Sequence, residues 1–379
     1  RHATSSLLRR ALLPSCVQPG RCREVASRSI IDPALVDSFG RRHRYLRISL
    51  TDRCNLRCRY CMPEDGEGED IFTPTAGGDM LTAEELQRLL RLFVRLGVRK
   101  VRLTGGEPTV RGDFDRILQD MGEVNAGLPE PMSMGITTNG VRLRRFLPAM
   151  RAGGLRNINL SLDTLQPAKF PFLAGKPKEW HARIMEVMHE IASQEEHFNL
   201  KLNCVLFQGA NEDEIGSFVD LTESLPIEVR FLEFMPFDGN AWSANRLVPQ
   251  ADIVEAVQKH LEARGLRADR LPPDTPHDVA RLWQVPGWSG RIGVIASMTD
   301  AFCGGCNRLR VTAKGEIRNC LFGEEGWSLR DLLRSGASDE SLAATVAQAT
   351  LRKHGKLGGK RDMFELRDRR EKALPMISL

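Results

Sequence analysis

The chain has 379 residues, enough for one large α/β domain with an appendage or for two medium domains, and with 41% hydrophobic and 27% charged residues its composition is ordinary for a globular enzyme. No apolar run reaches the roughly 18 residues that a membrane-spanning helix needs, so the sequence predicts no membrane span. The net charge of +5 is too small to predict a nucleic-acid-binding protein by itself.

The amino-terminal segment has the composition of a targeting leader. Residues 1–30 contain six arginines and five serines, with Glu24 as their single acid. This pattern is typical of a mitochondrial transit peptide, and a basic tail without an address is the alternative. We therefore assign residues 1–40 to a transit-like leader and expect the protein in the mitochondrial matrix.

After residue 40, strand-like and helix-like segments alternate. A helix at 81–97 begins with a capping box, Thr82 and Glu85, and ends at Gly97. Strands are predicted at 45–51, 99–104, 132–140, 155–163, 200–207 and 227–236, and further helices at 145–154, 178–194 and 211–225. Six such units predict an α/β fold with parallel strands, arranged as a partial barrel.

The rhythm changes after residue 245. A helix at 249–265 is followed by a proline-rich linker, "RLPPDTPHDVA", and by a strand at 290–298. We divide the folded chain into a barrel, 41–245, and a smaller module docked on it, 246–379.

The first predicted strand leads into three closely spaced cysteines. Cys54, Cys58 and Cys61 follow it in "TDRCNLRCRYCM". Three thiolates suit an iron–sulfur cluster that keeps one iron open for an exogenous ligand. A structural zinc ion with a remote fourth ligand is the alternative.

A second set of three cysteines, Cys303, Cys306 and Cys320, lies in the smaller module. Taken alone, this spacing is typical of a zinc knuckle, and a second open cluster is the other interpretation. Arg308 and Arg310 follow on alternate positions of a predicted strand, so both point to the same side and suit a phosphate or another anion. A solvated basic strand face is the alternative.

Several segments carry a family resemblance. The spacing of the first cysteine set, with Tyr60 before the third cysteine, resembles the radical S-adenosylmethionine superfamily, and "TGGEPTVRGD" resembles its glycine-rich element. Followed in order by "ITTNG", "INLSLD", "EVRFLEFMP" and "FCGGCNRLRVTAKGEIRNCLF", these segments closely resemble the GTP 3′,8-cyclase family of molybdenum-cofactor biosynthesis.

The resemblance implies a partial (βα)6 TIM-like barrel of the radical S-adenosylmethionine type, with one 4Fe–4S cluster and S-adenosylmethionine. The smaller carboxyl-terminal module is implied to carry a second 4Fe–4S cluster, whose open iron binds the guanine of GTP. In this family a 5′-deoxyadenosyl radical takes hydrogen from ribose C3′, and bond formation to guanine C8 gives 3′,8-cyclo-7,8-dihydroguanosine triphosphate. An electron donor, a homodimer and cyclic pyranopterin monophosphate synthase as the next enzyme are also implied.

The resemblance assigns site residues by motif. The first cluster would be held by Cys54, Cys58 and Cys61, and the second by Cys303, Cys306 and Cys320. S-adenosylmethionine would be contacted by Tyr60, Gly105, Gly106, Glu107, Ser161 and Met235. GTP would be contacted by Arg47, Arg102, Thr137, Lys201, Arg308 and Arg310, with Arg230 catalytic, near the reacting centre.

The arginines fit a triphosphate, which carries about four negative charges. Arg47, Arg102 and Arg230 are each expected near the carboxyl end of an otherwise apolar strand, where a cation is unusual unless it faces a ligand. Arginines that extend from a strand edge to solvent are the alternative.

Both ends depart from the family pattern. Family members end in Gly-Gly, whereas this sequence begins with Arg1 and stops at "LPMISL". We expect both ends to be incomplete, and a protein without the Gly-Gly tail to bind its cofactors but turn over poorly.

Two other functions compete with the cyclase. A peptide-modifying radical enzyme usually carries a longer carboxyl-terminal cysteine array than three. A zinc protein that binds nucleic acid usually carries aromatic residues, on which bases stack, between its basic residues. The chain has only two tyrosines, which argues against this function.

Overall fold

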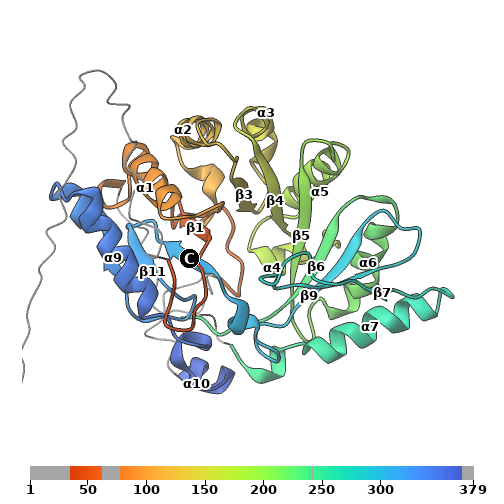
Figure 1. Cartoon of the computed structure of the whole chain (residues 1–379). Helices are drawn as coiled ribbons and strands as arrows, with labels where there is room; N and C mark the ends of the chain where they lie inside the picture. Colours follow the sequence, from red (N-terminus) through yellow and green to blue (C-terminus); the bar gives the residue numbers. More distant parts are fainter. Residues whose placement is uncertain (1–34, 62–76, 239, 241, 369–379) are drawn as a thin grey trace, which may run out of the picture.

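The structure, a computed structural model, describes residues 35–61, 77–238, 240 and 242–368. One curved sheet of twelve strands runs through it, with helices on its outer side (Figure 1). The strands are β1 (Tyr45–Ser49), β2 (Lys100–Thr104), β3 (Ser133–Thr138), β4 (Leu155–Ser161), β5 (Asn199–Leu206), β6 (Glu228–Glu233), β7 (Asp269–Arg270), β8 (Arg281–Gln284), β9 (Arg291–Ile295), β10 (Arg308–Val311), β11 (Glu316–Arg318) and β12 (Trp327–Ser328). The helices are α1 (Ala83–Arg95), α2 (Phe114–Ala126), α3 (Leu147–Ala152), α4 (Phe170–Ala174), α5 (Glu179–Ala192), α6 (Ile215–Ser224), α7 (Gln250–Glu262), α8 (Leu329–Arg334), α9 (Asp339–Leu351) and α10 (Met363–Asp368).

The middle of the sheet is parallel, which confirms the predicted α/β class. The strand order is β12-β11-β10-β1-β2-β3-β4-β5-β6-β9-β8-β7, and every neighbouring pair from β10 through to β9 is parallel. The segment after residue 245 therefore extends the barrel sheet at both edges, through β9 beside β6 and through β10 beside β1. The division at 245 stays a prediction, and the two parts share one sheet.

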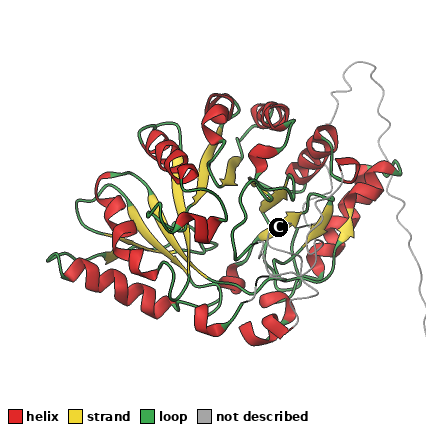
Figure 2. Cartoon of the chain, turned by 180° about the vertical axis from the view of Figure 1, so that it is seen from behind, coloured by secondary structure: helices red, strands yellow, loops and turns green. Residues whose placement is uncertain are grey.

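The two faces of the parallel strands differ sharply. Leu46, Ile48, Val101 and Leu103 on β1 and β2 are almost wholly buried in the main hydrophobic core. Seen from behind, the helices form a layer around these strands (Figure 2). Since side chains alternate along a strand, the residues between these positions, such as Arg47, lie on the inner, concave face.

Local signals account for α1. Thr82 accepts a hydrogen bond from the backbone N–H of Glu85, and the Glu85 side chain accepts one from the N–H of Thr82, so the predicted capping box is confirmed. Gly97 follows with a φ of 99°, a conformation that favours glycine.

Other expectations are corrected or extended. The chain forms α2 between β2 and β3, a helix that we did not predict because the glycine and proline turn before it hides its apolar spacing. Arg47, Arg102 and Arg230 are each the third residue of their strand, so they lie in mid-strand instead of near its carboxyl end. Cys204 is buried in β5.

The start of the described chain is packed. Leu35 is buried, and the buried Asp37 carboxylate binds Arg41 and His43. Residues 1–34 of the expected leader, and the carboxyl-terminal "LPMISL", lie outside the described residues. No helix in the described ranges is long and apolar enough to cross a membrane.

Candidate active site

The first cysteine loop is held against the end of β2 by two glycines. The N–H of Gly106 donates to the carbonyl of Thr51 at 2.7 Å. A Cβ at Gly105 would lie 2.2 Å from the Thr51 carbonyl oxygen, and one at Gly106 would lie 2.2 Å from that of Arg53. The loop can therefore approach this closely only because both positions are glycine.

The three thiols of this loop are partly buried and lie close enough to affect one another's pKa. Burial raises the pKa of Cys54 to about 11, and burial with the thiolate of Cys54 raises that of Cys61 to about 12. Burial also raises the pKa of Cys58, and the thiolates of Cys61 and Cys54 act in the same direction. The N–H of Leu56 donates to Cys54 Sγ at 3.4 Å. Deprotonating three buried thiols together requires a strongly positive partner, which the irons of a cluster supply, so the donor set fits a 4Fe–4S cluster.

Glu107 connects the ends of β2 and β3. Its side chain is wholly buried and accepts hydrogen bonds from Thr109 N at 3.1 Å, Thr138 Oγ1 at 2.7 Å and Asn139 N at 2.7 Å. Asn139 in turn donates to Asn55 Oδ1 in the cysteine loop at 2.8 Å. Glu107 thus braces the loop, and its contact with S-adenosylmethionine stays a prediction.

The other residues expected near S-adenosylmethionine also lie at the carboxyl ends of the strands. Ser161 ends β4, and Met235 lies two residues beyond β6. Tyr60 packs on Phe207 with 5.4 Å between ring centroids. It hydrogen-bonds Asp163, a residue that we did not predict, whose pKa burial raises to about 6.

A row of guanidinium groups crosses the inner face. Arg310 of β10 is paired in register with Arg47 of β1, and Arg47 with Arg102 of β2. Neighbouring strands are about 4.8 Å apart, so three like charges lie side by side. Arg102 donates to the Tyr45 hydroxyl at 2.9 Å and to the carbonyl of Ile136 at 2.9 Å.

Two of these groups are incompletely satisfied. The Nε atoms of Arg47 and Arg310 are buried and have no hydrogen-bond partner. Burial and the charges of Arg310 and Arg102 together lower the pKa of Arg47 to about 9. Buried donors without acceptors are rare in proteins, and several cations in one place favour an anionic ligand.

The opposite side of the inner face carries mixed polar groups. Thr137, Asn159, Lys201 and Glu228 are paired in register across β3, β4, β5 and β6. Lys201 Nζ lies 3.3 Å from a Glu228 carboxylate oxygen, and Arg230 Nε contacts the same carboxylate.

Polar atoms without hydrogen-bond partners also lie on this side. The side-chain oxygens of Asn159 and Asn203 are buried and lack partners. Burial and the charge of Arg230 lower the pKa of Lys201 to about 8. This side therefore offers both acceptors and donors to a polar ligand.

The second cysteine set lies at the other end of the strands. Cys306 precedes β10, whose first residue is level with Tyr45 at the start of β1, and Cys320 follows β11 at the same end. The first set follows the carboxyl end of β1. The five residues of β1 span about 17 Å, so the two sets are separated along the strands by about that distance, with the arginine row between them.

The electrostatics of the second set also fit a cluster. Burial raises the pKa of Cys303, and the thiolates of Cys320 and Cys306 raise it further. Burial opposes ionisation of Cys306, but Arg308 and Lys353 outweigh it and lower the pKa of Cys306 to about 6. Arg308 also lies over the Phe302 ring, 4.8 Å from its centroid.

No group of three His, Cys, Asp or Glu side chains in the described part of the chain converges on the position of one metal ion. The thiols of each set are thus close enough to shift one another's pKa without surrounding a single ion.

Sequence reasoning missed several groups on the inner face, namely Tyr45, Asn159, Asn203 and Glu228. Each occupies a strand position that alternates with a buried apolar residue, as Asn159 does between Ile158 and Leu160. That alternation was the available signal.

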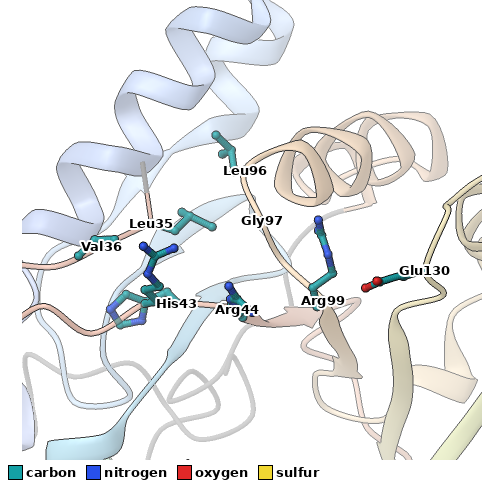
Figure 3. A pocket seen from close by; sticks show the side chains of 9 residues that line it. Leu35, Val36, His43, Arg44, Leu96, Gly97, Arg99 and Glu130 are labelled. Carbon is teal, nitrogen blue, oxygen red and sulfur yellow. The ribbon is translucent and has the colours of Figure 1, made fainter. Parts of the chain in front are cut away.

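A separate cavity of about 300 Å³ lies outside the amino end of β1. Its lining includes Arg42, Arg44, Arg99 and Glu130 (Figure 3). It contains none of the predicted site residues, so it is distinct from the inner face of the barrel.

Two family models match the chain. The radical SAM superfamily matches residues 48–222, and the family described as Molybdenum Cofactor Synthesis C matches residues 227–358. The matched ranges include the first and second cysteine sets, respectively.

Curated relatives agree with these matches. The chain is 44% identical to "GTP 3′,8-cyclase, mitochondrial" from Arabidopsis thaliana over 92% of its own length and 84% of that protein. It is 38% identical to a GTP 3′,8-cyclase from Acidothermus cellulolyticus, covering 83% and 84% of the two chains. It is also 45% identical to "Molybdenum cofactor biosynthesis protein 1" from Bos taurus over 91% of its own length, and it spans 51% of that relative, about half.

Among solved structures, Streptococcus suis SuiB bound to S-adenosylmethionine has a similar fold. The TM-score is 0.54 at 17% identity, covering 80% of this chain and 68% of that one. This likeness shows the fold alone.

Proposed function

Since the chain belongs to the GTP 3′,8-cyclase family of the radical S-adenosylmethionine superfamily, we propose that it is a lyase that converts GTP to (8S)-3′,8-cyclo-7,8-dihydroguanosine 5′-triphosphate. This is the first step of molybdenum-cofactor biosynthesis. The bound 4Fe–4S clusters and S-adenosylmethionine supply the radical chemistry. The chain's own residues bind, orient and shield the substrate.

The arginine row is the observation that carries this proposal. A row of Arg310, Arg47 and Arg102, of which the first and last are buried and two have buried Nε atoms without partners, favours an anion of several charges. A triphosphate, with about four negative charges, meets that need. Arg308 and Lys201 add cations on either side, and Thr137 adds a hydroxyl.

The arginine row lies between the two cysteine sets, which is where a substrate shared by two clusters would bind. We propose that Cys54, Cys58 and Cys61 hold the cluster used with S-adenosylmethionine, and that Cys303, Cys306 and Cys320 hold the second cluster, which takes the guanine. The open carboxyl-end rim, with Tyr60, Gly105, Gly106, Glu107, Ser161 and Met235, is then the S-adenosylmethionine side.

Arg230 has a positioning partner. Its Nε binds the Glu228 carboxylate, which Lys201 and Arg291 also approach. We propose that this arrangement fixes the guanidinium beside the reacting ribose, where it would hold the substrate in place without moving during the reaction.

The proposal extends to the surroundings of the enzyme. The Arabidopsis relative is named mitochondrial, which supports a mitochondrial enzyme, and we place it in the matrix. Reduction of the first cluster needs an electron donor, and the product passes to cyclic pyranopterin monophosphate synthase. A homodimer is part of the same proposal.

The test is anaerobic purification with iron, sulfide and zinc analysis, followed by EPR spectroscopy and product analysis. We expect about eight irons per chain, one cluster signal altered by GTP and the other by S-adenosylmethionine, and formation of the cyclised nucleotide. Zinc at the second site, with no spectral response to GTP, would contradict the proposal even if the first cluster is present.

A further inference from the structure

Lys353 is a buried lysine without an acidic partner in the described ranges. It follows α9 and is 3% exposed. Its ammonium donates to the carbonyl of Arg308 at 3.0 Å and to the carbonyl of Asn319. Lys360 differs, because this buried lysine pairs with the Glu324 carboxylate at 2.5 Å.

The two acceptors of Lys353 belong to the segments that carry the second cysteine set. Arg308 lies two residues after Cys306, and Asn319 directly precedes Cys320. One ammonium group therefore connects the two segments, although they come from different strands. Lys353 therefore adds to the β10–β11 pairing in holding the two cysteine segments together.

In the described part of the chain no carboxylate pairs with the Lys353 ammonium, so its counter-charge must come from the cysteines. Burial lowers its pKa, and Arg310 and Arg308 lower it further, whereas thiolates at Cys306 and Cys320 raise it. The charge of Lys353 also lowers the pKa of His43. A buried ammonium without a negative partner is strongly unfavourable, so the cysteine set with its bound group is the natural counter-charge.

A second contact comes from the turn just beyond. The N–H of Leu357 donates to Cys303 Sγ at 3.5 Å. Leu357 has a φ of 45°, the single positive φ among the non-glycine residues of the described chain. Backbone strain of this kind is typical of functional sites, and here it directs a donor at the remaining thiol. Leu357 thus contacts Cys303, and Lys353 contacts the segments next to Cys306 and Cys320.

We propose that Lys353 is a positioning residue for the second cluster. This lysine fixes Cys306 and Cys320, and its charge balances the negative charge of the bound cluster. Charge balance and hydrogen bonds to sulfur are among the factors that set cluster potentials. A fixed cation favours the reduced form, so Lys353 raises the midpoint potential. This inference rests on the proposed function, because it requires a cluster at these cysteines.

The test uses full-length protein in which only the second cluster forms, with Cys54, Cys58 and Cys61 changed to alanine. In this background, Lys353→Met, Lys353→Arg and the matched control Lys360→Met are compared by iron content and anaerobic redox titration followed by EPR. We expect a more negative midpoint potential for Lys353→Met, recovery toward the parent value for Lys353→Arg, and no shift for the control.

The outcomes separate this inference from the proposed function. A background protein without iron would overturn the second cluster and this inference with it. A loaded Lys353→Met variant with the parent's potential would overturn the inference alone. If Lys353→Met loses its iron while thermal unfolding shows a folded chain, rescue by Lys353→Arg supports the role of the charge, and failure of that rescue refutes it.

Discussion

Replacing Arg310 with methionine separates ligand binding from stability. Arg310 is 5% exposed, its Nε has no partner, and its nearest register neighbour is another cation, Arg47. An unmet buried donor is unfavourable by about 1–3 kcal/mol. Arg310→Met removes this donor and the repulsion between Arg310 and Arg47. The free energy of unfolding of the GTP-free protein is therefore unchanged or rises by up to about 3 kcal/mol.

The same substitution weakens GTP binding. A hydrogen bond to a charged group contributes about 1.5–3 kcal/mol, which corresponds to a dissociation constant roughly 10 to 100 times higher. The assays are anaerobic titration calorimetry with GTP on the cluster-loaded protein and urea unfolding without GTP. A purely structural arginine would behave in the opposite way, with lost stability and retained affinity.

Arg318 provides the matched control. It is paired with Arg310 across β10 and β11, and its Nε likewise has no partner, but its terminal nitrogens bind Glu316 Oε2 at 2.8 Å and the carbonyl of Glu324 at 2.9 Å. Arg318→Met therefore lowers the free energy of unfolding by about 1–3 kcal/mol and leaves GTP affinity unchanged. If Arg310→Met is destabilised like the control and still binds GTP as wild type does, the assignment of the arginine row to GTP is wrong.

Three further predictions concern other parts of the site. Because burial lowers the pKa of Lys201 to about 8, GTP affinity falls as the pH rises through about 8, whereas Lys201→Arg retains it in calorimetric titrations. The unfolded lysine keeps a pKa of about 10.4 and binds more protons than the folded one, so in urea unfolding without GTP the stability of wild type relative to Lys201→Arg rises from about pH 8 to 10. Gly106→Ala sets a Cβ against the Arg53 carbonyl at 2.2 Å and displaces the first cysteine loop, so iron analysis finds about four irons in place of eight; a full complement of iron would contradict this. Glu228→Gln removes the carboxylate shared by three cations and lowers the free energy of unfolding by about 3–5 kcal/mol in urea titrations, and an unchanged midpoint would refute its role as a brace.

Local patterns were predictable from the sequence. The capping box of α1, the six strands of the barrel and the cysteine spacings depend on residues close together in the chain, and the structure has the helix and the strands where the patterns indicate them. The helix α2 was missed because Gly105, Gly106 and Pro108 interrupt the signal just before it. The sequence shows that these residues form a turn. It does not show that the turn packs against the cysteine loop, because that is a tertiary contact.

Long-range pairing was not predictable. The register that sets Arg310 beside Arg47 joins residues more than 250 positions apart, and it depends on β10 reaching the free edge of β1. Asn159 and Asn203 alternate with buried apolar residues in their own strands, but the pairing of β4 with β5 that sets them on the same face is not visible in either segment. The extension of the barrel sheet by β9 and β10 likewise depends on packing that no single segment contains.

The hydrophobic face of the sheet explains how the charged face can exist. The inner face holds more cations than the Glu228 carboxylate balances, so their repulsion opposes the arrangement when no anion is present. The strands cannot relieve it by sliding, because a shift of one residue would move Leu46 and Ile48 out of the core and Arg47 into it. Apolar packing on the outer face therefore fixes the cations on the inner face before any ligand arrives. An anion that binds there meets groups that are already oriented, so little of its binding free energy is spent on ordering them.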